Sequence, residues 1–300
     1  MILSRRTLLT GTGAVAALAL VDRSISPASA AQLKAIGLQL YTVRELFAKD
    51  PVATLEAVAR IGYREVEFGG GGYETMDHAL LRKTLDRLGL TAPSVHIGYD
   101  ALLQRFEPSV AMARTLGAKT VVLPYMTDEH RNEQGWNAAL PNFNRFATQL
   151  KSAGFGFAYH NHDFEFTVRP GGVSLYDRLL KETDPALVKL ELDIYWAAHA
   201  GEDPAALVDR LSTRLYAYHV KDMRPDRSMT AVGQGTLDFA ALFKRKSGAG
   251  VQHFYVENDQ APAPYLPDIT TSFRRCAHCA SDRDRRPRPW PQPTGSTRSS

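Results

Sequence analysis

The sequence predicts an α/β protein of a single domain, a (β/α)8 TIM barrel. Strand-like apolar stretches alternate with stretches of helical periodicity along the whole core, eight times in all. The connections between them are short, and a serial repeat of this kind favours a closed parallel barrel over an open sheet. No Gly-x-Gly-x-x-Gly motif follows the first strand, which further disfavours a dinucleotide-binding sheet.

The first four strand–helix units give the clearest signals. In the segment 51–61, the apolar residues Val52, Leu55 and Val58 recur at helical spacing. A glycine follows each of the four expected helices, as is typical of helix C-terminal ends. We expect strands at 36–41, 65–68, 92–96 and 120–123, and helices at 51–61, 80–88, 101–116 and 137–153.

The second half repeats this order but ends weakly. Asp203 stands where the N-cap of a helix is expected. The apolar periodicity is lost after Phe273, so the last helix is expected to be short. We expect strands at 155–160, 188–193, 215–220 and 251–257, and helices at 174–181, 204–211, 239–244 and 266–274.

The first thirty residues are typical of a twin-arginine signal peptide. The sequence SRRTLL at 4–9 precedes an apolar run at 11–21, and Ala28-Ser29-Ala30 forms a small-residue cleavage site. The run is shorter than the roughly 20 apolar residues that span a bilayer, which favours a removable signal over an anchor. The sequence therefore predicts export by the twin-arginine route, to the periplasm or outside the cell, without stable membrane insertion after cleavage.

The other end of the chain has a different composition. Residues 281–300 hold mainly Arg, Pro and Ser, and we expect disorder there because little apolar surface is available to bury. Cys276 and Cys279 form a single CxxC pair without a second pair, which argues against a zinc or redox role. The expected organisation is a signal peptide at 1–30, a catalytic barrel at 31–275 and an Arg/Pro-rich tail at 276–300.

The net charge of +4 comes largely from the two ends. Between Ala31 and Phe273 no basic patch with interleaved aromatic residues is evident, which argues against nucleic acid as a partner. The number of subunits is left open. The net charge therefore says little about function.

Polar side chains stand at the ends of the last four expected strands. In a TIM barrel these ends converge on the site, and residues of equal parity along a strand share a face. His160, Asp193, His219 and Glu257 occupy equivalent positions there. Two imidazoles and two carboxylates suit Mn²⁺, Zn²⁺, Co²⁺ or Fe²⁺. The sequence therefore predicts one divalent metal ion, of undecided identity, although each residue alone could be an ordinary hydrogen-bonded group.

Further polar and aromatic residues near the strand ends are candidates for contacts with substrate. Trp196 could stack on a sugar face or pack at the rim. Lys221 could stabilise an enediolate or be a solvated lysine. The glycines at 69–72 predict a flexible loop, since the Lys and Ser/Thr of a phosphate-binding loop are missing. The expected substrate-binding residues are Gln39, Tyr41, Glu67, His96, His162 and Trp196.

Six further segments stand out in the core: LQLYTVR at 38–44, YHNHDFEF at 159–166, LDIYW at 192–196, HVKD at 219–222, GQG at 233–235 and VEND at 256–259. Together these segments resemble the sugar phosphate isomerase/epimerase family of xylose-isomerase-like TIM barrels. The resemblance covers roughly 35–273, and the members of the family include ketose 3-epimerases, hydroxypyruvate isomerase, inosose dehydratase and lyases of 3-keto-glycosides.

The resemblance implies a metal held by residues of the last four strands. The family's ketose epimerases use Glu, Asp, His and Glu, and Asp193, His219 and Glu257 match the last three. His160 stands where those epimerases have the first glutamate. Because the two glutamates act as opposed acid and base, this departure weakens two-base epimerisation, while one carboxylate and an imidazole suit isomerisation or β-elimination as well.

The sequence thus predicts a divalent-metal-dependent sugar isomerase or epimerase that acts through a metal-bound enediolate. The expected catalytic residues are Glu257, His160 and Lys221. Expected export favours a free sugar or keto-sugar over a phosphorylated one. The alternatives are a 3-keto-glycoside lyase or hydratase, and a non-catalytic exported sugar-binding barrel, although binding a neutral sugar needs no metal.

Overall fold

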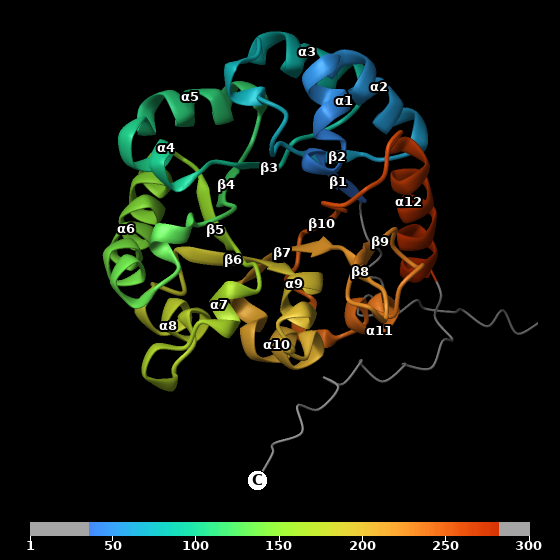
Figure 1. Cartoon of the computed structure of the whole chain (residues 1–300). Coiled ribbons are helices and arrows are strands. Elements are labelled where there is room, and N and C mark those ends of the chain that lie inside the picture. The colour runs from blue at the N-terminus through green and yellow to red at the C-terminus, as the bar shows by residue number, and fades with distance from the viewer. Residues whose placement is uncertain (1–35, 282–300) are drawn as a thin grey trace, which may run out of the picture. The chain divides into compact units, whose positions relative to one another are not determined.

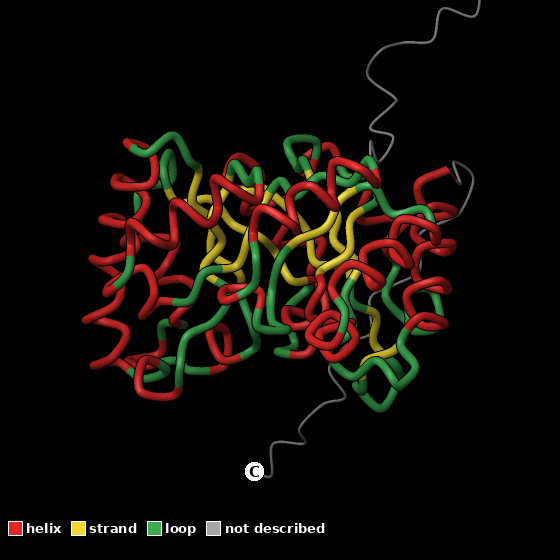
Figure 2. The backbone as a smooth tube through the Cα atoms, turned by 90° about the horizontal axis from the view of Figure 1, so that it is seen from above, coloured by secondary structure: helices red, strands yellow, loops and turns green. Residues whose placement is uncertain are grey.

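The expected barrel is confirmed. The structure is a computed structural model that describes residues 36–281 of the 300, with side chains described through residue 277. Eight parallel strands form a nearly closed barrel with helices between them. Figures 1 and 2 show the strands gathered at the centre and the helices around them.

The barrel strands follow the order β2-β1-β10-β7-β6-β5-β4-β3, and every pair is parallel. A separate two-stranded antiparallel ribbon, β8 and β9, follows β7. The strands are β1 (Gly37–Gln39), β2 (Glu65–Glu67), β3 (Ser94–His96), β4 (Thr120–Leu123), β5 (Gly156–His160), β6 (Val188–Asp193), β7 (Leu215–Val220), β8 (Asp222–Met223), β9 (Met229–Thr230) and β10 (His253–Val256).

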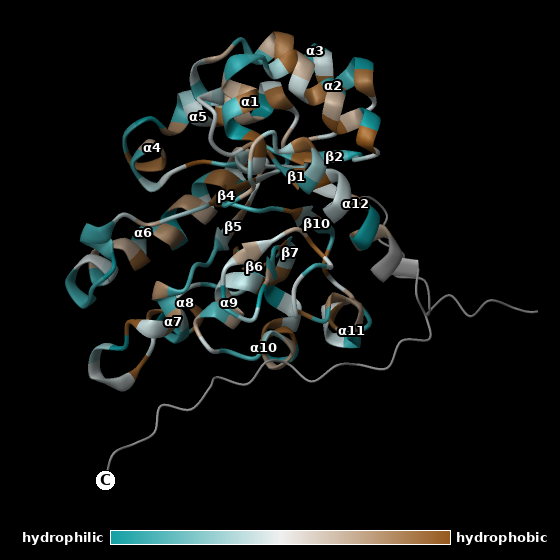
Figure 3. Cartoon of the chain, turned by 45° about the vertical axis from the view of Figure 1, so that its right-hand side comes forward, coloured by the Kyte–Doolittle hydropathy of each residue, from teal (hydrophilic) through white to brown (hydrophobic). Residues whose placement is uncertain are grey.

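The helices pack around the strands, and Figure 3 shows that they carry both hydrophobic and hydrophilic residues. The α-helices are α1 (Arg44–Lys49), α2 (Pro51–Ile61), α3 (His78–Leu88), α4 (Tyr99–Gln104), α5 (Phe106–Leu116), α6 (Glu133–Ser152), α7 (Phe164–Thr167), α8 (Leu175–Glu182), α9 (Ile194–His199), α10 (Pro204–Leu211), α11 (Phe239–Phe243) and α12 (Leu266–Ser281). Short 3-10 helices are η2 (Leu40–Val43), η3 (Tyr73–Thr75), η4 (Asp128–His130), η5 (Pro170–Gly172), η6 (Ser212–Arg214) and η7 (Lys246–Gly248).

Several expected elements differ from the structure by a few residues at their ends, and three differences have a visible local feature. The first strand ends at Gln39, whose side chain accepts a hydrogen bond from the Tyr41 amide and begins η2. The helix expected at 101–116 is split into α4 and α5, because Arg105 has the non-helical angles φ −136° and ψ 43°. The last helix continues to Ser281, and Cys276 is buried within it.

The barrel has one weakly paired seam, between β2 and β3. Only two isolated bridges join this edge, Glu65 with Thr91 and Phe68 with Val95. The His96 amide also donates to the Phe68 carbonyl at 2.9 Å. The side chains of β2 and β3 are therefore held close without a continuous ladder.

Apolar residues fill the barrel interior below the polar site. Ala158, Ala217 and Tyr255 belong to a small buried cluster, and each precedes a polar residue of equal parity on its strand. Gly37 faces the Tyr255 ring so closely that a Cβ atom there would overlap it. The tyrosine thus forms part of the floor on which the polar groups rest.

Candidate active site

Buried polar side chains gather at the carboxyl ends of the strands, as the parity of the strands requires. In β6, Glu191 and Asp193 share one face while Leu190 and Leu192 share the other. Glu191, Asp193 and His219 are fully buried. The cluster takes its members from β1, β2, β3, β5, β6 and β7 and from the segments that directly follow β7 and β10: Gln39, Glu67, His96, His160, Glu191, Asp193, His219, Lys221, Glu257 and Asp259.

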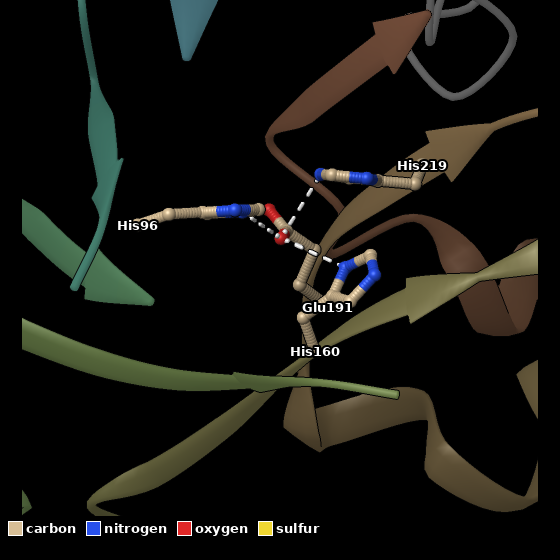
Figure 4. A group of neighbouring side chains, drawn as sticks. All are labelled: His96, His160, Glu191 and His219. Carbon is tan, nitrogen blue, oxygen red and sulfur yellow. Dashed lines mark hydrogen bonds and ion pairs between the residues drawn. The ribbon is translucent and has the colours of Figure 1, made fainter. Parts of the chain in front are cut away.

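Three imidazoles converge on one carboxylate oxygen, as Figure 4 shows. The Oε2 atom of Glu191 lies 3.1 Å from His96 Nε2, 3.2 Å from His160 Nδ1 and 3.0 Å from His219 Nε2. These three histidines come from β3, β5 and β7. We call His96, His160, Glu191 and His219 the imidazole group.

Glu67 presents a second carboxylate to the same rings. Its Oε2 lies 2.9 Å from both His96 Nε2 and His219 Nε2, and it accepts a hydrogen bond from Gln39 Nε2 at 2.8 Å. The Ser94 hydroxyl also contacts Glu67. Glu67 is thus fixed by neighbours from β1, β3 and β7.

A buried lysine forms the second half of the cluster, nearer the strand ends. Lys221 Nζ lies 3.0 Å from Asp193 Oδ2, 2.8 Å from Glu257 Oε2 and 3.0 Å from Asp259 Oδ2. The Trp196 ring lies 5.9 Å from the ammonium. We call Lys221, Asp193, Glu257 and Asp259 the lysine group.

The imidazoles differ in their affinity for protons. Burial lowers the pKa of His96, but Glu67 and Glu191 outweigh this effect and raise it to about 9. Burial and the neighbouring His219 lower the pKa of His160 to about 3. His160 is therefore neutral at neutral pH and keeps a nitrogen lone pair for a proton or a cation.

Within the lysine group, Lys221 and Glu257 stabilise each other's charged forms. Burial lowers the pKa of Lys221, but Asp193, Asp259 and Glu257 raise it well above its ordinary value. Burial raises the pKa of Glu257, yet Lys221 and His219 hold it well below its ordinary value. Burial raises the pKa of Asp259 to about 7, against the lowering effect of Lys221. Glu257 is therefore a carboxylate at neutral pH.

The donor set fits a divalent metal ion. Among the described residues, the imidazole group forms one set of ligand atoms within 4.8 Å of one another, and Asp193, His219 and Glu257 form another. The buried Oε1 of Glu191 accepts no hydrogen bond among the described residues, whereas Oδ2 of Asp193 lies 3.0 Å from Lys221 Nζ. A buried carboxylate oxygen without a donor, near imidazole nitrogens, is what a cation would satisfy.

The structure brings most of the expected site residues together. Gln39, Glu67 and His96 contact the ligand candidates, although the sequence suggested only contacts with substrate for them. The His162 and Trp196 rings lie 5.4 Å apart, and the His162 ring lies 5.1 Å from that of His160. Tyr41 lies apart from the cluster, 39% exposed under the Arg44 guanidinium.

Sequence reasoning missed Glu191, Asp259 and Ser94 as members of the site. Glu191 precedes Asp193 by two residues and Asp259 follows Glu257 by two, so equal parity was the available signal. Ser94 stands in the same relation to His96. Applying the alternation along each whole strand would have found all three.

The chain resembles several proteins over most of its length. It is 26% identical over 255 residues to an inosose dehydratase from Geobacillus kaustophilus, across 71% of this chain and 81% of that enzyme. Its structure matches a sugar phosphate isomerase/epimerase from Parabacteroides distasonis with a TM-score of 0.68 and 25% identity, over 79% of this chain and 95% of that one. It also matches the IOLI protein with a bound zinc atom, with a TM-score of 0.63 and 14% identity, over 82% and 98% of the two chains. That last likeness concerns the fold alone.

The expectation of export is wrong. The homologues of this chain are typically cytoplasmic enzymes, and neither the structure nor the comparisons give evidence of export. Within residues 36–281 no helix has the length and apolar character needed to cross a membrane. The expected signal at 1–30 and most of the expected disordered tail lie outside the described residues. Without export, the reason for preferring a free sugar over a phosphorylated one is also lost.

The family comparison agrees with the segments that first suggested it. A model of the xylose isomerase-like TIM barrel family matches residues 55–264, which include every member of the two groups defined above. Isomerases, epimerases and dehydratases occur in this family, so its members are enzymes of related chemistry. The chain belongs to the family of xylose isomerase-like TIM barrels.

Proposed function

We propose that this protein is a divalent-metal-dependent enzyme that removes the proton beside the carbonyl of a sugar-like keto compound and then eliminates a β-hydroxyl as water. The observation that carries the proposal is the pair formed by Glu257 and Lys221, a buried carboxylate and a buried ammonium 2.8 Å apart. A base and an acid side by side suit a reaction that takes one proton and delivers another.

Glu257 is the proposed base. Its pKa lies well below its ordinary value because Lys221 and His219 offset the effect of burial, so the carboxylate is available at neutral pH. Its Oε2 lies 2.6 Å from His219 Nδ1, which fixes its orientation. A proton taken from carbon would rest on this oxygen.

The proposed steps balance without an external reagent. Glu257 takes the proton of the carbon next to the carbonyl, and the C–H electrons form the enolate. The electrons return, the C–O bond of the β-hydroxyl breaks, and Lys221 gives that oxygen a proton so that water leaves. The chemistry that a bound divalent cation supplies is polarisation of the carbonyl and stabilisation of negative charge on its oxygen.

Isomerisation or epimerisation through an enediolate is the second candidate. The match to the isomerase/epimerase from Parabacteroides distasonis supports it. Here Glu257 would return its proton to the neighbouring carbon, while the hydroxyl proton moves to the former carbonyl oxygen. His160 stands where the family's ketose epimerases carry an acidic residue, and its imidazole contacts Glu191. This arrangement favours a proton transfer on one face over inversion between two carboxylates.

A proton NMR experiment in D₂O tests the proposal. The protein is loaded with Mn²⁺, Zn²⁺ or Co²⁺ and mixed in turn with a keto-inositol, free ketoses and 3-keto-glycosides. We expect loss of the signal of the proton beside the carbonyl, with a dehydrated product. Exchange with a ketose–aldose product would favour the second candidate. No exchange with any substrate under any loading would contradict both.

A further inference from the structure

We propose that Glu191 is a positioning residue that fixes the rings of two metal-binding histidines, His160 and His219, by accepting a hydrogen bond from each. The cation itself would lie among His160, Asp193, His219 and Glu257, the set that strand parity predicts. The inference deepens the proposed function and rests on it, because that function requires one bound cation. It concerns which nitrogen of each ring is turned toward that cation.

Glu191 lies on the strand between the two strands that carry these histidines. In the barrel, β6 pairs with β5 on one side and with β7 on the other. Glu191 stands opposite His160 in the first ladder, and Asp193 stands opposite His219 in the second. Glu191 and Asp193 share one face of β6, so the glutamate precedes an expected ligand by two residues on the same face. Its side chain can therefore reach a ring on either side.

Each ring presents one nitrogen to the same carboxylate oxygen, as Figure 4 shows. Glu191 Oε2 lies 3.2 Å from His160 Nδ1 and 3.0 Å from His219 Nε2. A carboxylate oxygen can only accept a hydrogen bond, so both nitrogens carry a hydrogen. An imidazole that binds a metal is neutral and has a single N–H. The lone pair then lies on Nε2 of His160 and on Nδ1 of His219.

These two remaining nitrogens face the expected carboxylate ligands. His160 Nε2 lies 3.5 Å from Asp193 Oδ2, and His219 Nδ1 lies 2.6 Å from Glu257 Oε2. Asp193, His219 and Glu257 offer ligand atoms that all lie within 4.8 Å of one another. A metal-binding histidine commonly donates its other N–H to a carboxylate, which fixes the tautomer and makes the ring a stronger ligand. Glu191 does this for both rings at once.

The neighbouring carboxylate Glu67 cannot take over this role. Its Oε2 lies 2.9 Å from His219 Nε2 and from His96 Nε2, but its ion pairs do not include His160. Among the described residues, Glu191 is the only carboxylate within ion-pair distance of both His160 and His219. His96 also contacts Glu191, at 3.1 Å, but it stands outside the expected ligand set. The orientation of the two ligand rings therefore depends on one side chain.

Two matched variants test the inference by metal affinity. Glu191→Gln and Glu165→Gln each change a fully buried carboxylate to an amide. Among the described residues, Glu165 accepts from the Tyr159 hydroxyl and the His162 amide, and from no imidazole. The proteins are stripped with EDTA and titrated with Zn²⁺ alone, and circular dichroism checks the fold. We expect Glu191→Gln to weaken Zn²⁺ affinity by about 10–100-fold, and Glu165→Gln to leave it unchanged.

A second measurement observes the rings directly. With ¹⁵N-labelled histidine, two-bond ¹H–¹⁵N NMR spectra distinguish a protonated ring nitrogen from an unprotonated one, and His160→Gln and His219→Gln identify the two sets of signals. In the Zn²⁺-loaded wild type we expect the hydrogen on Nδ1 of His160 and on Nε2 of His219. In the metal-free wild type, His160 should already carry its hydrogen on Nδ1. Glu191→Gln should lose this preference, and Glu165→Gln should keep it.

Several results would overturn the inference. A hydrogen on Nε2 of His160 in the wild type would do so even if Glu191→Gln does not fold. Unchanged Zn²⁺ affinity and tautomers in Glu191→Gln would show that the carboxylate fixes neither ring. Equal losses of affinity in Glu191→Gln and Glu165→Gln would mean that any buried carboxylate has the same effect.

The outcome can be separated from that of the proposed function, because every readout is taken without substrate. The expected tautomers without any deuterium exchange into substrate would support the inference and contradict the proposed function. Wild-type protein that binds no Zn²⁺ would contradict both.

Discussion

The two halves of the site solve the same physical problem in different ways. Carboxylates are buried in both, and an unpaired buried charge is costly. In the lysine group a permanent ammonium compensates Asp193, Glu257 and Asp259. In the imidazole group, rings whose charge can change surround Glu191. A fixed positive charge suits a base that must stay ionised, whereas the imidazole group combines His96, whose pKa is raised to about 9, with His160, whose pKa is lowered to about 3.

The largest expected effect concerns the base. Glu257→Gln keeps the shape of the side chain but removes the basic oxygen, so turnover should fall by about 10²–10⁴-fold. His160→Gln should mainly weaken metal affinity and recover activity with added metal. Deuterium exchange into substrate separates the two roles. If Glu257→Gln exchanges at the wild-type rate and His160→Gln does not, the assignment is reversed.

Removal of the ammonium should cost stability. Lys221→Met leaves three buried carboxylates without their cation, and breaking a buried pair of this kind typically costs about 3–5 kcal/mol. Urea unfolding monitored by circular dichroism gives the free energy. The double variant Lys221→Met/Asp193→Asn should recover part of the loss, because one of the uncompensated charges is gone.

Lys189→Met is the matched control near the amino end of β6, where the ammonium donates hydrogen bonds to the backbone carbonyls of Pro185 and Thr213. Its stability should change by no more than about 1 kcal/mol. Equal losses in the free energy of unfolding for Lys221→Met and Lys189→Met would show that the ion pairs of Lys221 add no particular stability.

Another buried carboxylate, Glu165, lies outside both groups and is stabilised by protonation. Burial raises the pKa of Glu165 to about 8, although hydrogen bonds from Tyr159 and the His162 amide lower it. Between pH 4.5 and 8 the unfolded chain loses this proton and the folded chain keeps it. Stability should therefore fall as pH rises through this range, by at most about 1.4 kcal/mol per pH unit from this group.

Glu165→Gln serves as the reference, because its amide does not titrate. Urea midpoints at pH 5 and pH 8 should show a steeper decline for the wild type than for this variant. Asp163 and Tyr176 also face Glu165, and both remain in the two proteins, so their effects cancel in the difference. Parallel declines would mean that Glu165 is ionised throughout.

Much of the fold followed from local patterns. The strands at 188–193 and 215–220 and the helices at 51–61 and 204–211 have the expected bounds. Asp203 caps its helix by accepting from the Ala205 amide. These elements depend on apolar period and capping chemistry within a few residues. The break at Arg105 does have a local signal, because Pro108 lacks the amide that would bond to the Gln104 carbonyl and its ring clashes with that carbonyl in a continuous helix.

The site was harder to predict, because contacts across the barrel join residues far apart in the chain. Strand parity grouped His160, Asp193, His219 and Glu257. It did not reveal that Lys221 would lie between Asp193 and Glu257, or that His96 from the first half would meet Glu191 from the second. These contacts depend on the length and rotamer of each side chain inside the closed barrel. Local sequence patterns do not determine either of them.

The weak seam between β2 and β3 makes the site part of the barrel's mechanical closure. Two isolated bridges hold this edge, and beside them Ser94 and His96 of β3 contact Glu67 of β2. These side-chain contacts join the two strands where the backbone hydrogen bonding between them is incomplete. Occupancy of the site should therefore tighten the seam, and amide hydrogen exchange at His96, whose N–H crosses it to Phe68, should slow when a cation binds. Cation binding at the site and closure of the barrel between β2 and β3 should therefore be thermodynamically coupled.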